Sequence, residues 1–218
     1  MEKATEGQGI VYHKPRVGEW TLSGVSYGGK TITCKVIEEM TESATQDKLI
    51  SKYGLEIPST RLVWAIATRN YELGLRNKNK KVSETLRQFL GQAVRQGIHT
   101  STRNVYNPEG EEDEAIHNYG TSEQYSIKGN IAGIGGFVHK ISDKRTLETF
   151  FGTQNAIRIN EVAQSVNRTD AYIRTLDSKP KEREERVARF YADDDRLGLF
   201  CDGDPRGEYP AFRVLKVE

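Results

Sequence analysis

Hydrophobic and polar positions alternate in two stretches near the start of the chain. The alternation predicts β-strands over residues 19–27 and 30–37, and both stretches are rich in threonine and valine. β-Branched side chains suit strands because they pack well on a pleated surface. The strands are separated by Gly28 and Gly29, and a Gly-Gly pair supplies the positive φ that a two-residue hairpin turn needs. The pattern therefore predicts a β-hairpin.

Helical periodicity follows in two longer segments. Apolar residues recur on one face of residues 61–75, and again at i, i+4, i+7 and i+8 spacing in residues 82–96. Ser83 is a candidate N-cap for the second helix, and Gly97 is a stop signal. Both segments are long enough to bury a continuous apolar stripe, so we expect two helices packed on a sheet.

The other elements are shorter. We expect helices over 43–53, 142–151 and 157–167, strands over 98–107, within 127–141 and over 211–217, a basic loop at 76–81 and an acidic loop at 108–120. The fold class is therefore α+β, with two helices packed on small, twisted antiparallel sheets and with the N- and C-terminal strands paired. We expect a single domain over 1–218, with residues 1–9 frayed.

Composition narrows the class of protein. The chain has 218 residues, with 32 Lys and Arg against 31 Asp and Glu, so its formal net charge is +1. A protein built mainly to hold nucleic acid or to coat an anionic membrane would show a basic excess. No apolar run is long enough to span a membrane, and residues 1–9 lack the apolar core of a signal peptide. We expect a cytoplasmic or virion-associated protein.

The chain contains two cysteines, Cys34 and Cys201. They cannot form a disulfide scaffold or a four-ligand zinc site. No two of the four histidines have metal-ligand spacing on one helix, and no serine lies in a nucleophile-elbow sequence. These residues therefore give no reason to expect a cofactor, a cysteine- or histidine-bound metal or a catalytic centre.

A helix-turn-helix is an alternative for residues 158–176. Two short helices would meet near Arg168, and residues 169–176 would form the helix that reads DNA. Arg168 and Arg174 could then contact phosphates. The near-zero net charge and the aspartate at position 170 argue against this alternative.

An acidic run suggests calcium as a second alternative. Asp193, Asp194 and Asp195 are consecutive, and Asp202 and Asp204 follow closely. Calcium prefers six or more oxygen ligands, but the EF-hand spacing is missing. Turn chemistry accounts for Asp-Gly-Asp-Pro equally well, so the sequence leaves the question open.

The segment 186–217, called the C-terminal segment below, mixes charges and aromatic residues without periodicity. Unpaired charges are too costly for a core, while exposed aromatic residues beside charges are typical of binding surfaces. Leu197 and Leu199 lie two apart and should face inward together. The ligand-binding residues that we expect to share one solvent-facing patch are Tyr191, Asp194, Asp195, Arg196, Gly198, Phe200, Asp202, Asp204, Arg206, Glu208, Tyr209 and Phe212.

Three short segments, in order along the chain, resemble segments of the C-type-lectin fold in the branch shared with formylglycine-generating enzymes. Residues 55–60 (LEIPST) resemble the family's Gly-x-Leu-Pro-Thr helix start. Residues 99–104 (HTSTRN) resemble its Trp-Thr-Ser-Thr strand, with His99 in place of tryptophan. Residues 211–214 (AFRV) resemble its closing Gly-Phe-Arg-Val strand.

Within that fold, the C-terminal segment is most similar to the variable proteins of diversity-generating retroelements, in particular the archaeal type. The resemblance implies a fixed scaffold that carries freely exchanged residues and binds varied macromolecular ligands, either a protein or a surface glycan. The implied scaffold positions are Arg189, Phe190, Leu197, Leu199, Pro205, Pro210, Ala211 and Val214. The enzyme branch needs a pair of redox cysteines in the C-terminal half, where this chain has Cys201 alone. We therefore expect a non-catalytic binding protein, and an enzyme of the formylglycine-generating type is the alternative. We expect no nucleic-acid partner, in keeping with the near-zero net charge.

Overall fold

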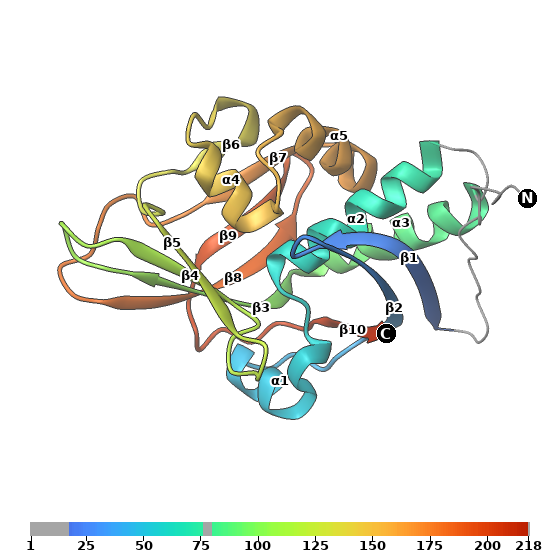
Figure 1. Cartoon of the computed structure of the whole chain (residues 1–218), viewed down its shortest axis with the longest axis horizontal. Coiled ribbons are helices and arrows are strands. Elements are labelled where there is room, and N and C mark those ends of the chain that lie inside the picture. The colour runs from blue at the N-terminus through green and yellow to red at the C-terminus, as the bar shows by residue number, and fades with distance from the viewer. Residues whose placement is uncertain (1–17, 76–79, 218) are drawn as a thin grey trace, which may run out of the picture.

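The computed structural model describes residues 18–75 and 80–217, and of Lys80 the backbone only. Within these ranges the chain forms five α-helices, two short 3₁₀-helices and ten β-strands (Figure 1). In chain order they are β1 (Glu19–Tyr27), β2 (Lys30–Met40), α1 (Gln46–Tyr53), η1 (Gly54–Glu56), α2 (Thr60–Leu75), α3 (Lys80–Gln96), β3 (Ile98–Tyr106), β4 (Asp113–His117), β5 (Tyr125–Gly129), β6 (Gly136–Phe137), η2 (Val138–Lys140), α4 (Lys144–Phe151), α5 (Ala156–Asn167), β7 (Asp170–Arg174), β8 (Glu184–Ala192), β9 (Arg196–Gly203) and β10 (Phe212–Val217). The α+β class expected from the sequence is confirmed.

The smaller sheet has three strands in the order β1-β2-β10. Gly28 and Gly29 form the turn between β1 and β2, both with positive φ, as the hairpin pattern predicts. The last strand, β10, pairs antiparallel with β2, with Val214 opposite Val36. The predicted pairing of the N- and C-terminal strand regions is therefore confirmed.

The larger sheet has seven strands in the order β5-β4-β3-β8-β9-β7-β6. All its neighbours are antiparallel except β7 and β9, which are parallel. Strand β3 is buried along its whole length, because α1 and β8 contact it as well as α2. Strands β8 and β9 carry the first half of the C-terminal segment, and β7 pairs with β9 beside them.

Helices α2 and α3 join the two sheets through aromatic side chains. Trp64 of α2 stacks on Phe190 of β8, with ring centroids 6.1 Å apart. Phe89 of α3 contacts Trp20 of β1 at 5.1 Å and Phe212 of β10 at 5.9 Å. One continuous cluster of buried residues therefore connects both sheets, and the prediction of two helices packed on a sheet is confirmed.

Two details of the helical prediction differ. Helix α3 already includes Lys80, so Ser83 lies inside the helix and is not its cap. The Ser83 hydroxyl instead donates a hydrogen bond of 2.9 Å to the Asn70 carbonyl of α2, which ties the two helices together. Most of the expected basic loop, 76–79, and the frayed residues 1–9 lie outside the described residues.

The predicted acidic loop at 108–120 contains a strand, β4. Its alternate residues Asp113, Ala115 and His117 are fully buried. The buried Asp113 carboxylate accepts hydrogen bonds from the backbone amides of Asn107, Ile131 and Ala132, and it pairs with Lys179 at 3.0 Å. Four donors replace water around this carboxylate, which is why an acidic residue can start a buried strand.

The proposed helix-turn-helix is wrong. Helix α5 forms as expected, but the reading helix expected over 169–176 is instead strand β7, parallel to β9. Ala171 and Ile173 are buried in the sheet while Tyr172 and Arg174 point the other way, which is the period of a strand. Arg168 ends α5 with a φ of 63°.

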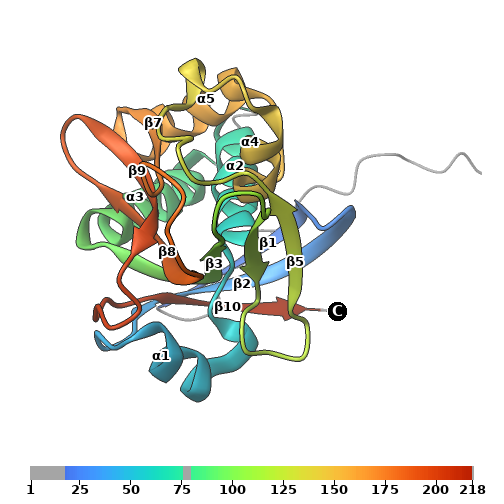
Figure 2. The ribbon, with the colours of Figure 1, turned by 90° about the vertical axis from the view of Figure 1, so that its left-hand side faces the viewer.

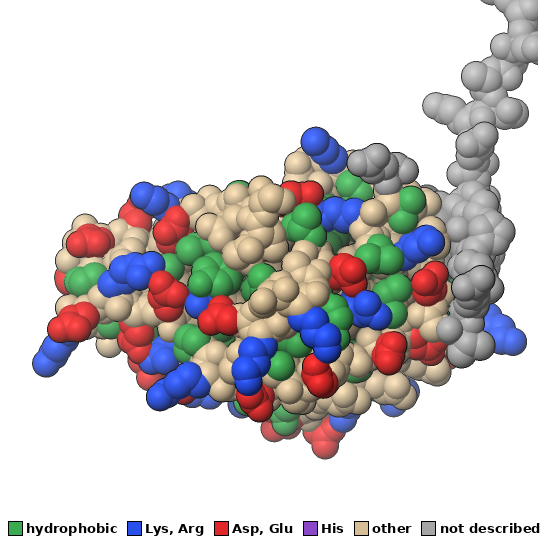
Figure 3. Space-filling view, turned by 90° about the horizontal axis from the view of Figure 1, so that it is seen from below, with side chains coloured by type: hydrophobic (Ala, Val, Ile, Leu, Met, Phe, Trp, Pro, Cys, Tyr) green, Lys and Arg blue, Asp and Glu red, His purple; other side chains and the backbone are tan. Residues whose placement is uncertain are grey.

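The face seen from the side of α1 carries charges of both signs, interspersed with small hydrophobic areas (Figure 3).

Within the described ranges, no helix is both long and apolar enough to cross a membrane.

Candidate ligand-binding surface

Strand β9 separates the core from an outer face. Leu197 and Leu199 are 2% and 0% exposed and belong to the hydrophobic core, so the predicted inward register is confirmed. Gly198, Phe200 and Asp202 alternate with them and point to the other side of the sheet. One face of β9 therefore packs in the core, and the other face contributes to the outer side of the sheet.

The register of the sheet brings residues of three strands together on this side. Gly198 lies between Tyr191 of β8 and Tyr172 of β7, and Phe200 lies between Arg189 and Arg174. We call the side of β7, β8 and β9 that carries these residues the outer face. Helices α2, α3 and α5 pack on the opposite, core side of these strands, where Trp64 contacts Phe190. In Figure 2, β8 and β9 lie along one side of the molecule, with α2, α4 and α5 beside them.

Phe200 is less exposed than the sequence predicts. It points to the outer face but is only 8% exposed, because neighbouring side chains cover it. The Tyr191 ring meets it edge-on at 5.9 Å, and the guanidinium groups of Arg189 and Arg174 lie 5.5 and 5.8 Å from its centroid. A ligand would therefore meet these three side chains before the Phe200 ring.

Gly198 is also buried, and it has no side chain to offer a ligand. A Cβ atom at this position would lie 2.4 Å from the Phe200 ring. Its contribution is therefore to leave room for Phe200 rather than to contact a ligand directly.

Phe212 does not belong to the surface. Its ring is 1% exposed and meets Phe89 of α3 edge-on in the core. In β10 it points inward together with Val214, two residues further on. The expectation that Phe212 faces solvent is therefore wrong.

The remaining residues form a strip rather than one compact patch. Asp194 and Asp195 lie in the turn between β8 and β9, whereas Asp204, Arg206 and Glu208 follow the other end of β9. The eight residues of β9 separate the two groups by roughly 24 Å at about 3.4 Å per residue. Tyr191, Phe200, Asp202 and Tyr209 lie between or beside these ends, and Arg196 borders the turn.

The loop after β9 is held in place at several points. Tyr209 exchanges two backbone hydrogen bonds with Ala44, at 3.2 and 3.3 Å. The His99 ring meets the Tyr209 ring edge-on at 5.2 Å, and its Nε2 donates to the Gly207 carbonyl at 3.0 Å. Burial lowers the pKa of His99 and so favours the uncharged ring. Tyr209 is thus presented in a fixed orientation.

The aspartates of the segment serve ion pairs and turns. Asp202 pairs with Arg174 at 2.9 Å, and Asp194 with Arg95 at 3.2 Å. Asp193 accepts hydrogen bonds from the amides of Asp195 and Arg196, both at 2.9 Å. In the Asp-Gly-Asp-Pro stretch, Asp204 accepts a hydrogen bond of 2.9 Å from the Arg206 amide, which is the turn chemistry considered from the sequence. Among the described residues, no three His, Cys, Asp or Glu side chains gather as a metal-ligand set.

Three outer-face residues, and His99 of β3 beside Tyr209, were not among the site residues predicted from the sequence. Arg189 was assigned to the scaffold, His99 to a strand, and Tyr172 and Arg174 to the helix that the structure replaces with β7. The signal for Arg189 was its spacing of two from Tyr191, which places both on one side of a strand. The signal for β7 was the alternation of Ala171 and Ile173 with Tyr172 and Arg174.

Neither cysteine is exposed to solvent. Cys201 is fully buried in β9, and burial raises its thiol pKa well above the usual value. Cys34 is buried in the smaller sheet, where burial raises its pKa to about 12. A nucleophilic cysteine needs access and a lowered pKa, and neither thiol has either property.

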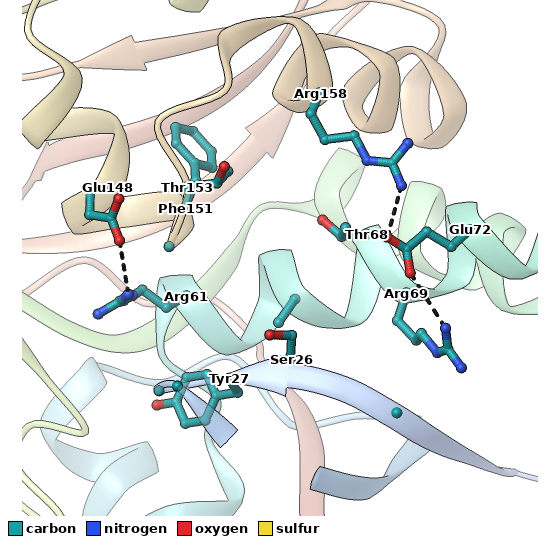
Figure 4. Close-up of a pocket in the computed structure, with 15 residues that line it drawn as sticks. Ser26, Tyr27, Arg61, Thr68, Arg69, Glu72, Glu148, Phe151, Thr153 and Arg158 are labelled. Carbon is teal, nitrogen blue, oxygen red and sulfur yellow. Dashed lines mark hydrogen bonds and ion pairs between the residues drawn. The ribbon is translucent and has the colours of Figure 1, made fainter. Parts of the chain in front are cut away.

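Away from the outer face, a hollow of about 440 Å³ lies between the β1–β2 hairpin, α2 and α4. Figure 4 shows Arg61 with Glu148 at one end of it, and Glu72 between Arg69 and Arg158 at the other. The guanidinium–carboxylate distances are 3.8 Å at the first end and 3.4 and 2.9 Å at the second. Its charged side chains therefore already have partners of opposite charge.

Comparison with protein-family models, with curated proteins and with solved structures found no match. The functional argument therefore depends on the geometry of the chain itself.

Proposed function

We propose that this chain is a non-catalytic binding protein that recognises a protein ligand through the outer face. The observation that carries the proposal is the division of β7, β8 and β9 into two faces. Their inner side chains build the core, while their outer side chains contact mainly one another and the loop after β9. Aromatic rings and arginines are enriched at the energetic centres of protein interfaces.

The outer face has restrained aromatic side chains at its centre and charged side chains around them. Tyr209 and Phe200 are held by ring contacts, so a ligand would order few side chains on binding them. Asp204, Arg206 and Glu208 are exposed around them and can change partners readily. A buried aromatic centre with a charged rim is the usual anatomy of a protein–protein interface.

The resemblance to the C-type-lectin fold supports this proposal. Backbone hydrogen bonds bring the three resembling segments together: the Ser101 amide donates to the Pro58 carbonyl at 2.9 Å, and the His99 amide donates at 2.9 Å to the carbonyl of Pro210, which directly precedes the third segment. The Thr60 amide also donates to the Thr102 hydroxyl at 3.0 Å. Segments far apart in sequence thus meet at one place, as a shared fold would require.

We further propose, on the same resemblance, that the C-terminal segment is diversified by a retroelement. The arrangement suits such a role, because outward positions such as 204, 206 and 208 contribute no side chain to the core. The test is the neighbouring DNA. A near-identical copy of the coding segment that differs at adenines, beside a reverse-transcriptase gene, is the expected finding.

The binding proposal is tested with a displayed random-peptide library selected on the full chain. We expect the selected peptides to lose affinity at least about tenfold for Tyr191→Ala or Tyr209→Ala, since aromatic anchors cost more than about 1.4 kcal/mol when truncated. Tyr71→Ala on α2 is the matched control, because Tyr71 lies beside Arg158, away from the outer face. Thermal melts check that each variant is folded.

Peptides that bind both outer-face variants and the control equally well would contradict the proposal. A glycan array probed with the same variants provides the second arm. Glycan binding that depends on Tyr209, without any peptide binding, would replace the protein ligand by a carbohydrate.

A further inference from the structure

The guanidinium of Arg189 lies next to two aromatic rings of the outer face. Its guanidinium carbon lies 4.2 Å from the centroid of the Tyr209 ring and 5.5 Å from that of Phe200. Both rings have their own restraints, Tyr209 from His99 and Phe200 from Tyr191. The planar guanidinium is therefore oriented before any ligand arrives.

Arg189 has no partner of opposite charge among the described residues. None of their ion pairs includes it, and its buried Nε–H group has no hydrogen-bond acceptor. A half-buried cation with an unsatisfied donor is costly, and contact with aromatic rings compensates it only in part. The group is therefore ready to accept an anion.

The nearby carboxylates already form ion pairs with other arginines. Asp202 pairs with Arg174 at 2.9 Å, and Asp204 pairs with Arg206 at 2.9 Å. The hydrogen bonds from Arg206 lower the pKa of Asp204 to about 2, so this carboxylate stays ionised and paired. Each of these two ion pairs has no net charge, so the Arg189 guanidinium is left as the charge without a partner.

A hollow of about 200 Å³ opens beside Arg189. Its walls come from Arg174, Asp202, Phe200, Tyr209 and Gly207, together with Arg189 itself. A hollow of this size has room for a single side chain rather than for an extended ligand.

We propose that Arg189 binds a carboxylate of the ligand, so that the protein selects partners that present an acidic side chain to this hollow. The inference deepens the proposed function and rests on it. A guanidinium fork matches a carboxylate with two parallel hydrogen bonds, and stacking rings hold the fork in the plane that this geometry requires. The aspartates beside the hollow disfavour a more highly charged phosphate.

The direct test observes the arginine Nε–H signals of the full chain by NMR. The probes are glutamate and glutamine, each blocked by N-acetyl and N-methylamide groups, so that they differ only in the side-chain charge. Arg189→Lys identifies the Arg189 signal by its loss. We expect the glutamate probe to shift this signal saturably and the glutamine probe to leave it in place, while the signal of Arg145, 61% exposed on α4, does not move.

Equal shifts with both probes, or none with either, would overturn the inference. Tighter binding of inorganic phosphate than of the glutamate probe would overturn the choice of a carboxylate.

The peptide library separates this inference from the proposed function. We expect selected peptides to be enriched in Asp and Glu and to bind Arg189→Met about 10- to 100-fold more weakly, because a hydrogen bond to a charged group is worth about 1.5–3 kcal/mol. Arg145→Met is the control and should bind like the wild type. Peptides that need Tyr209 but are neither acidic nor sensitive to Arg189→Met would overturn the inference and leave the proposed function standing.

Discussion

His117 makes the stability of the fold depend on pH. It lies on β4, is 0% exposed, and its Nδ1 is 3.0 Å from the Thr102 hydroxyl. Burial lowers its pKa to about 3, and the charge of Arg61 acts in the same direction. In the unfolded chain a histidine has a pKa of about 6.5. Between these two values the unfolded chain binds more protons than the folded one, so acid destabilises the fold.

The size of the effect follows from the two pKa values. Protonating the unfolded histidine at pH 5 favours unfolding by about 2 kcal/mol relative to neutral pH, and the full loss near pH 3 approaches about 5 kcal/mol, from about 1.4 kcal/mol per unit. Stability contributed by neutral His117 is therefore fully present above about pH 7 and is lost as the pH falls through 6.5 towards 3.

The assay is urea unfolding at pH 7.5 and pH 5.0, a range in which most carboxylates stay ionised. We expect the wild type to lose at least about 2 kcal/mol between the two conditions, and His117→Gln to lose about 2 kcal/mol less than the wild type. His139→Gln is the matched control, since it removes an imidazole that is 44% exposed rather than a buried one. A His117→Gln variant with the same pH dependence as the wild type would refute the argument.

Three further predictions concern the scaffold and the rejected DNA-binding alternative. Leu90→Ala should cost about 2–5 kcal/mol in denaturant unfolding, because it leaves a cavity under α3, whereas the exposed Gln92→Ala on the same helix should cost less than about 0.5 kcal/mol. Gly91→Ala should lower the melting temperature although alanine favours helices, because its Cβ would lie 2.8 Å from the Val166 carbonyl oxygen of α5; a melting temperature at or above that of the wild type would contradict this. Duplex DNA should not bind above the weak background of a near-neutral protein, and Arg168→Ala should not change this; a salt-steep, sub-micromolar affinity that is lost in that variant would support a DNA-binding function.

The parts of the fold that the sequence predicts well are those with local signals. The β1–β2 hairpin has both its alternation and its Gly28-Gly29 turn within a short window, and α2 and α3 have long apolar stripes. These patterns depend on neighbouring residues only, so no knowledge of the tertiary structure is needed.

Strand β7 shows why the remainder is harder. Five residues are too few to distinguish a strand from a short helix by period, and what fixes β7 is its parallel pairing with β9, more than twenty residues further along the chain. The prediction that Phe212 faces solvent was wrong for a related reason. The contact that buries it comes from Phe89 of α3, far away along the chain, so no local pattern reveals the burial.

Arg189 shows how the site could be misread even where the strand was expected. The resemblance places Arg189 in the scaffold, and a scaffold position is easily taken to be a buried one. In the structure a scaffold residue can also be the fixed floor of a binding surface, because the strand register turns its side chain outward, opposite Phe200.

The outer face divides into positions that differ in how freely they can change. Asp204, Arg206 and Glu208 extend from a loop whose backbone is held elsewhere, by the Tyr209–Ala44 pairing, so new side chains there would alter the surface without removing a core contact. Gly198 and Phe200 are coupled, because any side chain at 198 must displace the Phe200 ring, which in turn contacts Arg189. Exchange in the loop would therefore change which ligand edge is recognised, whereas exchange at 198 or 200 would reorient the arginine on which we expect the ligand's carboxylate to bind.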